Sequence, residues 1–109
     1  NGNADGAFVY TGFKPAFVMI KSTSAGNAQA WLMFDNKRPG YNLVDYFLEA
    51  DTSSAEAVNN PNQRIDILSN GFKLRSSAGG INLGANNYIY MAFAEQPLVG
   101  TNNIPCTAR

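Results

Sequence analysis

The sequence predicts an all-β fold, an antiparallel sandwich of two sheets that is jelly-roll-like and built from six or seven short strands. Its composition is rich in Asn, Gly, Ser and aromatic residues and only 15% charged, without the Ala/Leu/Glu/Lys bias of helical proteins. Its apolar runs are short and separated by Asn and Gly, which is typical of sandwiches and barrels. Three of these runs are apolar on both alternating faces, and two stacked sheets are the simplest way to cover them.

The strongest local signal is a hairpin over residues 65–75. Asn70 and Gly71 separate two apolar runs, and both residue types tolerate the positive φ that a tight primed turn requires. After the turn, Phe72 and Leu74 alternate with two basic residues. This alternation predicts a strand that is buried on one face and exposed to water on the other.

Further strands are expected where short apolar runs end at turn residues, at residues 7–11, 16–21, 29–35, 81–83 and 88–94. We expect the runs 16–21 and 29–35 to pair as an antiparallel hairpin across a loop of small residues. The run 88–94 is apolar or aromatic on both faces, which predicts a central strand that is covered on both sides.

The segment 41–57 is ambiguous. Its apolar residues recur at roughly helical spacing, and Asn42 is placed to cap a helix. The segment is short, however, and ends in a polar run. We therefore expect one short insert that lies on the sandwich as a helical turn or an irregular loop.

The length of 109 residues predicts a single domain over residues 1–109, with a linker-like segment at 1–6 and an extended tail at 98–109. The chain begins without Met, which suggests a processed product or a domain cut from a longer polypeptide. Cys106 is the only cysteine, so no internal disulfide can form. Its thiol is either incidental or a crosslink to a neighbouring chain.

Charge and residue types exclude several function classes. Eight basic and eight acidic residues give no net charge and no basic stripe, so nucleic acid is not expected as a partner. No apolar run approaches the ~18 residues of a transmembrane helix, so insertion into a membrane is not expected either. The absence of His rules out Ser-His and Cys-His pairs and His-bearing metal sites. The glycines form no phosphate loop, and the Asp and Asn residues lack calcium-loop spacing. We expect no cofactor, no metal and no enzymatic activity.

Two groups of residues are candidates for a site. Asp35, Asp66 and Glu95 lie near expected strand ends and would make a glycosidase pair if two of them converged. The favoured interpretation is that they are solvated or pair with basic side chains. Aromatic rings can also stack on sugars. Most are expected in the core, Trp31 and Tyr90 among them.

One aromatic residue is expected outside the core. Tyr41 lies in a loop after a Pro-Gly pair, where an exposed ring could contact a glycan. The candidate ligand contacts are therefore Tyr41, Asn42 and Arg38.

Several phrases together resemble a known family. They are GNADGAFVYTGFKPAFVMIK (residues 2–21), SAEA (54–57), LSNGFKLR (68–75) and YIYMAFAE (88–95). The chain resembles a β-rich domain of tailed-phage structural proteins, particularly of marine and cyanobacterial phages. In these proteins the domain commonly forms the C-terminal end of a tail-fibre-like or other virion protein. The resemblance spans nearly the whole chain and brings no catalytic residues with it.

The resemblance implies a component exposed on the virion, with other virion proteins as partners and a homo-oligomer, commonly a trimer in fibres. The first expectation is a tail-fibre adhesion module that contacts host surface glycan or protein. The alternative is a capsid or tail decoration or assembly protein that binds only other virion proteins. Exposed aromatic residues at one loop end would favour adhesion, and a broad apolar side patch would favour assembly.

Overall fold

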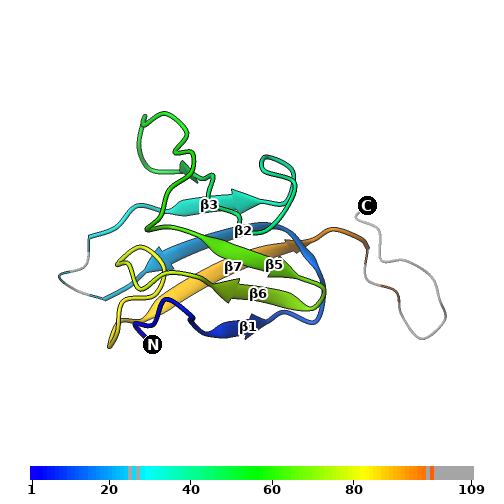
Figure 1. Cartoon of the computed structure of the whole chain (residues 1–109), viewed down its shortest axis with the longest axis horizontal. Coiled ribbons are helices and arrows are strands. Elements are labelled where there is room, and N and C mark those ends of the chain that lie inside the picture. Colours follow the sequence, from blue (N-terminus) through cyan, green and yellow to red (C-terminus); the bar gives the residue numbers. More distant parts are fainter. Residues whose placement is uncertain (25, 27, 98, 100–109) are drawn as a thin grey trace.

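The computed structural model describes residues 1–24, 26, 28–97 and 99, and it forms the expected two-sheet antiparallel sandwich (Figure 1). One sheet has three strands in the order β1-β6-β5, and the other has four in the order β4-β3-β2-β7. In chain order the strands are β1 (Phe8–Tyr10), β2 (Pro15–Ser22), β3 (Leu32–Asp35), β4 (Leu48–Glu49), β5 (Ile65–Leu68), β6 (Gly71–Leu74) and β7 (Tyr88–Ala94).

The predicted hairpin is confirmed as β5 and β6, with Leu68 opposite Gly71. The positive φ expected at Asn70 and Gly71 is not found. Glycine is required at position 71 for another reason. β1 pairs with β6 here, and a Cβ on Gly71 would lie 2.1 Å from the carbonyl oxygen of Val9.

The core lies between the two sheets. Its fully or almost fully buried apolar residues are Val18, Ile20, Leu32, Phe34, Val44, Phe47, Ile65, Ile67, Phe72, Leu74 and Ile81. Most come from strands in which every second side chain points inward, as the alternation in the sequence predicts. The predicted β2–β3 hairpin is confirmed, although β3 begins only at Leu32.

The insert 41–57 is irregular apart from the two-residue strand β4, and no helix occurs in the part of the chain that the structure describes. Val44 and Phe47 are buried, and their main chains form isolated bridges with Ile65 and Ala57. The main chain of Val44 thus bonds to the edge of β5, and that of Phe47 bonds within the insert, which a helix over these residues would not allow.

Two strand predictions are wrong. Residues 81–83 do not form a strand, and the N–H groups of Ile81 and Asn82 instead close a turn by bonding to the carbonyl of Ala78. β7 is an edge strand and not a central one, since β2 is the only strand that pairs with it among the described residues. A run that is apolar at every position shows that both faces of the strand are apolar. It does not show that both faces are covered by the same chain.

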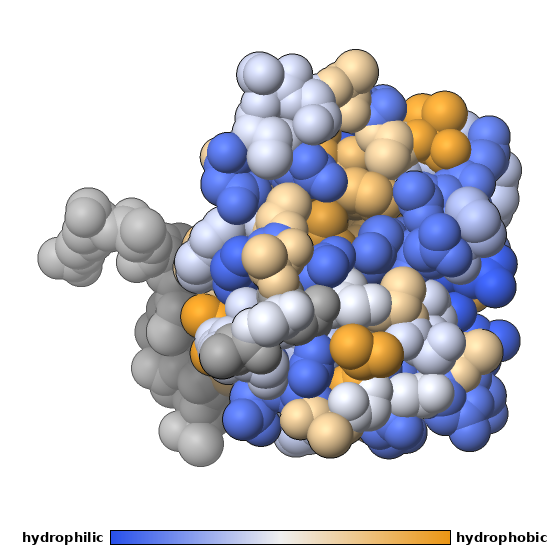
Figure 2. All heavy atoms as spheres, turned by 90° about the vertical axis from the view of Figure 1, so that its left-hand side faces the viewer, coloured by the Kyte–Doolittle hydropathy of each residue, from blue (hydrophilic) through white to orange (hydrophobic). Residues whose placement is uncertain are grey.

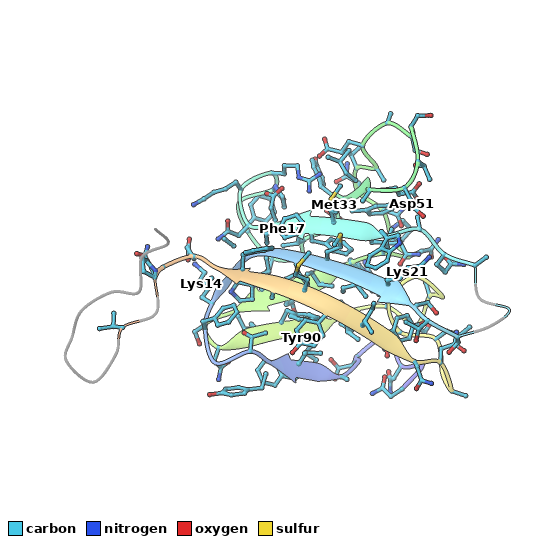
Figure 3. All side chains as sticks on the ribbon, turned by 180° about the vertical axis from the view of Figure 1, so that it is seen from behind. Lys14, Phe17, Lys21, Met33, Asp51 and Tyr90 are labelled. Carbon is cyan, nitrogen blue, oxygen red and sulfur yellow. The ribbon has the colours of Figure 1, made fainter. Side chains whose placement is uncertain are left out.

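The exposed fractions of the β7 side chains show that neither face of this strand is fully covered. Ile89, Met91 and Phe93 on its outer side are 49%, 44% and 55% exposed. On its inner side Tyr90 packs edge-on against Phe72, with ring centroids 5.3 Å apart, yet it remains 48% exposed. Tyr90 is predicted in the core, and it lies instead at the open border of the sandwich (Figure 3).

Residues 1–6, predicted as a linker-like segment, are bonded to the sandwich. The N–H of Gly2 bonds to Asn82, the N–H of Gly6 bonds to Leu74, and the buried Asn82 amide donates to the carbonyl of Asn3. The predicted tail at 98–109, including Cys106, lies outside the described residues except for position 99.

Candidate functional site

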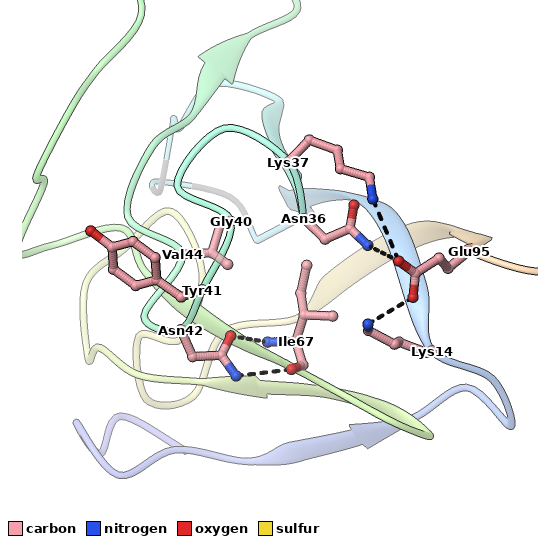
Figure 4. Close-up of a pocket in the computed structure, with 9 residues that line it drawn as sticks. All are labelled: Lys14, Asn36, Lys37, Gly40, Tyr41, Asn42, Val44, Ile67 and Glu95. Carbon is pink, nitrogen blue, oxygen red and sulfur yellow. Dashed lines mark hydrogen bonds and ion pairs between the residues drawn. The ribbon is translucent and has the colours of Figure 1, made fainter.

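An open pocket of about 380 Å³ lies at the end of the sandwich where β2 begins and β3 and β7 end (Figure 4). Loop residues that precede or follow these strands form much of its wall. The lining residues are Lys14, Asn36, Lys37, Gly40, Tyr41, Asn42, Val44, Ile67 and Glu95.

The Glu95 carboxylate is the centre of the polar wall. It lies 2.7 Å from Lys14 Nζ and 3.7 Å from Lys37 Nζ, and it accepts a 3.1 Å hydrogen bond from Asn36 Nδ2. The hydrogen bond from Lys14 holds the pKa of Glu95 below its ordinary value, against the opposing effect of burial. The pocket therefore contains an ionised carboxylate at neutral pH.

One atom of the Asn36 side-chain amide has no hydrogen-bond partner among the described residues. Its Nδ2 is bound to Glu95, whereas its Oδ1 is buried and has no hydrogen-bond partner in the described part of the chain. Buried polar atoms nearly always have a partner, so water or a ligand is the expected source here.

Tyr41 lines the pocket and is 76% exposed, and its ring points outward, away from Lys14, Lys37 and Glu95 (Figure 4). Gly40, which precedes it, has a φ of +73°, a conformation that glycine adopts without strain. The prediction that Tyr41 lies outside the core is therefore confirmed.

Asn42 also lines the pocket, but its amide is used within the protein. Its Nδ2 donates to the carbonyl of Ile67, and its Oδ1 accepts from the N–H of Ile67, both at 2.9 Å. Asn42 therefore does not cap a helix; its amide pairs with the edge of β5 (Figure 4).

Arg38 is not among the residues that line the pocket. Its guanidinium bonds to Asp35, to Glu56 at 2.7 Å and to the carbonyl of Met33 at 3.1 Å. Burial would raise the pKa of Asp35, but hydrogen bonds from Arg38 and Lys37 outweigh it and hold that pKa below its usual value. Of the three predicted contacts, the structure brings Tyr41 and Asn42 together at the pocket and places Arg38 in a separate network.

The three carboxylates considered as a glycosidase pair each bind a basic side chain. Asp35 binds Arg38, Asp66 lies 3.4 Å from Arg75, and Glu95 binds Lys14. This is the interpretation that the sequence favoured. Among the described residues no group of three or more His, Cys, Asp or Glu is placed to hold a metal ion, and no helix there is long and apolar enough to cross a membrane.

Sequence reasoning missed Lys14, Asn36 and Lys37 as pocket residues. The signal was their position, because Lys14 lies directly before β2, and Asn36 and Lys37 are the first two residues after β3. These residues reach the same end of the sheet through the pairing of β2 with β3 and β7. Their closeness can therefore be inferred only when that pairing is known.

A second surface is the exposed side of the four-stranded sheet, here called the outer face and seen in Figure 3. In the sheet register Met19 lies between Met33 and Met91, and Phe17 and Phe93 have ring centroids 5.9 Å apart. The apolar residues of this face are Phe17, Met19, Met33, Leu48, Ile89, Met91 and Phe93. The loop end shown in Figure 2 differs, since its apolar residues are scattered among hydrophilic ones.

Comparison with known proteins adds one result. A family model described as a domain of unknown function, DUF7483, matches residues 1–97. Comparisons with curated proteins and with solved structures found no match.

Proposed function

The chain belongs to the DUF7483 family, and we propose that it is a structural domain of a tailed-phage virion that contacts the host surface through the pocket beside Tyr41. The virion assignment rests on the resemblance of the motifs at residues 2–21, 54–57, 68–75 and 88–95. The proposed contact with the host surface is argued from the pocket.

The observation that carries the proposal is an exposed aromatic ring beside a pocket with charged walls. Tyr41 offers a flat apolar surface on which the C–H face of a sugar ring packs well. Lys14, Lys37 and Glu95 offer donors and acceptors for hydroxyl groups. The volume of about 380 Å³ suits one or two sugar units.

The charges favour an acidic sugar. The pocket wall carries two lysines and one carboxylate, Glu95, so one positive charge is left over. Lys37 is the more available one, since its side chain is 80% exposed and its Nζ lies 3.7 Å from Glu95, whereas Lys14 is 2.7 Å away. A sugar carboxylate would pair with Lys37 while its ring rests on Tyr41.

Binding of galacturonate oligomers, with galactose oligomers as the neutral comparison, tests this site by titration calorimetry. We expect galacturonate to bind more tightly, and Tyr41→Ala and Lys37→Ala each to weaken that binding by roughly tenfold. Tyr10→Ala is the matched control, because Tyr10 is also an exposed tyrosine but lies on β1 away from the pocket. No binding of either sugar, or equal losses in the Tyr10 and Tyr41 variants, would reject the site.

The alternative function is assembly, with only other virion proteins as partners. The outer face favours it, because an apolar surface that spans four strands is more than a monomer usually exposes without use. Electron cryo-microscopy of the virion of a phage whose genome encodes the domain separates the two functions. Density at a fibre tip supports adhesion, density tiled over capsid or tail supports assembly, and absence from the particle contradicts both.

A further inference from the structure

Four strand edges border the two sheets in the described part of the chain, and they differ in how they are protected. β4 and β1 are short, with two and three residues. The edge of β5 is covered by the bridge from Val44 and by the amide of Asn42. β7 is seven residues long, and within the described residues it pairs only with β2.

The sequence of β7 also lacks the usual protection of an edge. Proteins block long edges with charged residues, proline or a covering segment, because open N–H and C=O groups recruit another strand. β7 reads YIYMAFA, without a charge or a proline. An unprotected edge of this length indicates a surface that is meant to be paired.

Two hydrogen bonds reveal which residues of β7 face the open edge. The N–H of Glu95 bonds to the carbonyl of Lys14, and the carbonyl of Asn87 accepts from the N–H of Thr23, both at 2.9 Å. Backbone groups alternate in direction along a strand, so the odd-numbered residues of β7 face β2. The N–H and C=O groups that face the open edge belong to Tyr88, Tyr90, Ala92 and Ala94.

We propose that two copies of this chain pair antiparallel through β7, with Met91 facing Met91 of the second copy. In this register Tyr88 lies opposite Ala94 and Tyr90 lies opposite Ala92, in both directions, and each pair exchanges both of its N–H···O bonds. The pairing therefore gives a hydrogen-bond partner to the edge-facing N–H and C=O groups of all four residues. A shift by two residues in either direction would leave Tyr88 or Ala94 without a partner inside the strand.

The side chains fit the same register. On the inner side each bulky tyrosine meets a small alanine. On the outer side Ile89 meets Phe93, and the Met91 residues meet on the two-fold axis, about 4.5 Å apart at Cα. Past the strand ends Asn87 meets Glu95, so no like charges face each other.

The border of the sandwich beneath β7 is open and apolar, which supports a strand being added there. A small cleft at this border is lined only by apolar and aromatic residues: Val9, Ile20, Phe72, Leu74, Ile81, Tyr88 and Tyr90. A second β7 laid along the edge would cover Tyr90 and this cleft. It would also join the outer faces of both copies into one sheet.

Antiparallel pairing of two identical edges closes on itself, so it produces a dimer with two-fold symmetry. This edge would not build the trimer that the phage resemblance implies. The pairing edge meets the pocket wall only at Glu95, just past the end of β7, and the inference does not rest on the proposed host contact.

Placing opposite charges at position 91, on the two-fold axis, tests the register. The molar mass of each protein is measured by light scattering after size-exclusion chromatography. Wild type is expected to be a dimer, and Met91→Lys and Met91→Glu are each expected to be monomers. Their equal mixture should recover the dimer, because opposite charges then meet on the axis. Leu48→Lys, on the opposite border of the outer face, should remain a dimer. A monomeric or trimeric wild type, dimeric single variants, a mixture that stays monomeric or a monomeric Leu48→Lys would each overturn the proposal.

Proline substitutions test which residues face the edge. Ala92→Pro removes an N–H that points to the open edge, so we expect a folded monomer, with circular dichroism like that of wild type. Met91→Pro removes an N–H that bonds to β2 and should lower the melting temperature strongly. An Ala92→Pro variant that stays dimeric, or that unfolds as readily as Met91→Pro, contradicts the pairing.

Discussion

The side-chain amide of Asn42 binds the main chain of Ile67 through two hydrogen bonds of 2.9 Å (Figure 4). Its Nδ2 donates to the Ile67 carbonyl, and its Oδ1 accepts from the Ile67 N–H. A side chain here takes the place that a neighbouring strand would occupy beside β5. The same contact fixes the loop residue that follows Tyr41, so it joins the edge of one sheet to the wall of the pocket. Asn42 is therefore a structural residue of the candidate site.

Replacing Asn42 with Ala should lower the free energy of unfolding by about 1–3 kcal/mol, because both main-chain groups of Ile67 lose their partner. Asn42→Asp should also be less stable than wild type, since a carboxylate cannot donate to the Ile67 carbonyl. Urea denaturation measures both changes. Asn62→Ala, on an exposed loop, is the control and should be neutral. Equal stability of the Asn42→Ala and Asn62→Ala variants would show that the paired amide contributes nothing.

Tyr88→Phe should lower the free energy of unfolding by about 1 kcal/mol or more. The Tyr88 hydroxyl donates to the carbonyl of Gly79 and accepts from the N–H of Leu83, each at 2.8 Å. It thereby holds the turn that buries Ile81. Thermal unfolding measures the change, and Tyr10→Phe, at a tyrosine that is 67% exposed, is the control. A Tyr88→Phe chain as stable as the control would contradict this role.

The sequence predicted the sandwich and its hairpins because both depend on local pattern. Alternation marks strand faces, and Asn-Gly marks the turn before β6. Position within a sheet is a property of the whole chain, which is why the edge position of β7 was missed. Ile81 illustrates the same limit: it is fully buried, as an apolar residue in a strand would be, but its N–H bonds within a turn.

The site was predictable only in part. Tyr41 was found because it lies in an expected loop, between Gly40 and Asn42. Lys14, Lys37 and Glu95 come from three separate segments, and only the pairing of β2 with β3 and β7 brings them together. The sequence predicts the pairing of β2 with β3, but it does not place β7 beside β2.

Arg38→Ala should lower the free energy of unfolding by about 1.5–3 kcal/mol, because its guanidinium bonds to two carboxylates and one carbonyl and is mostly buried. Arg38→Lys should recover little of this loss, since a single ammonium cannot reach all three groups at once. Chemical denaturation gives the stabilities, and galacturonate titration of the same variants gives the binding. Unchanged stability together with lost sugar binding would make Arg38 a ligand contact and not a structural residue.

Glu95 should make the stability of the protein depend on pH on the acid side. Its hydrogen bond from Lys14 lowers its pKa in the folded state below the ordinary value of 4.5. The folded state therefore binds this proton less readily than the unfolded state. The stabilisation is present above pH 4.5 and is lost as the pH falls through the lower folded pKa.

Glu95→Gln removes this dependence, so its unfolding free energy should fall less steeply than that of wild type below pH 4.5. Lys14→Gln should flatten the curve in the same way, and the double variant should add little, because both residues belong to one ion pair. Asp35 keeps a lowered pKa in all three variants, so some acid sensitivity should remain. Urea titrations between about pH 3 and pH 7 measure these curves, and a Glu95→Gln curve parallel to that of wild type would mean that the Lys14–Glu95 pair does not stabilise the fold.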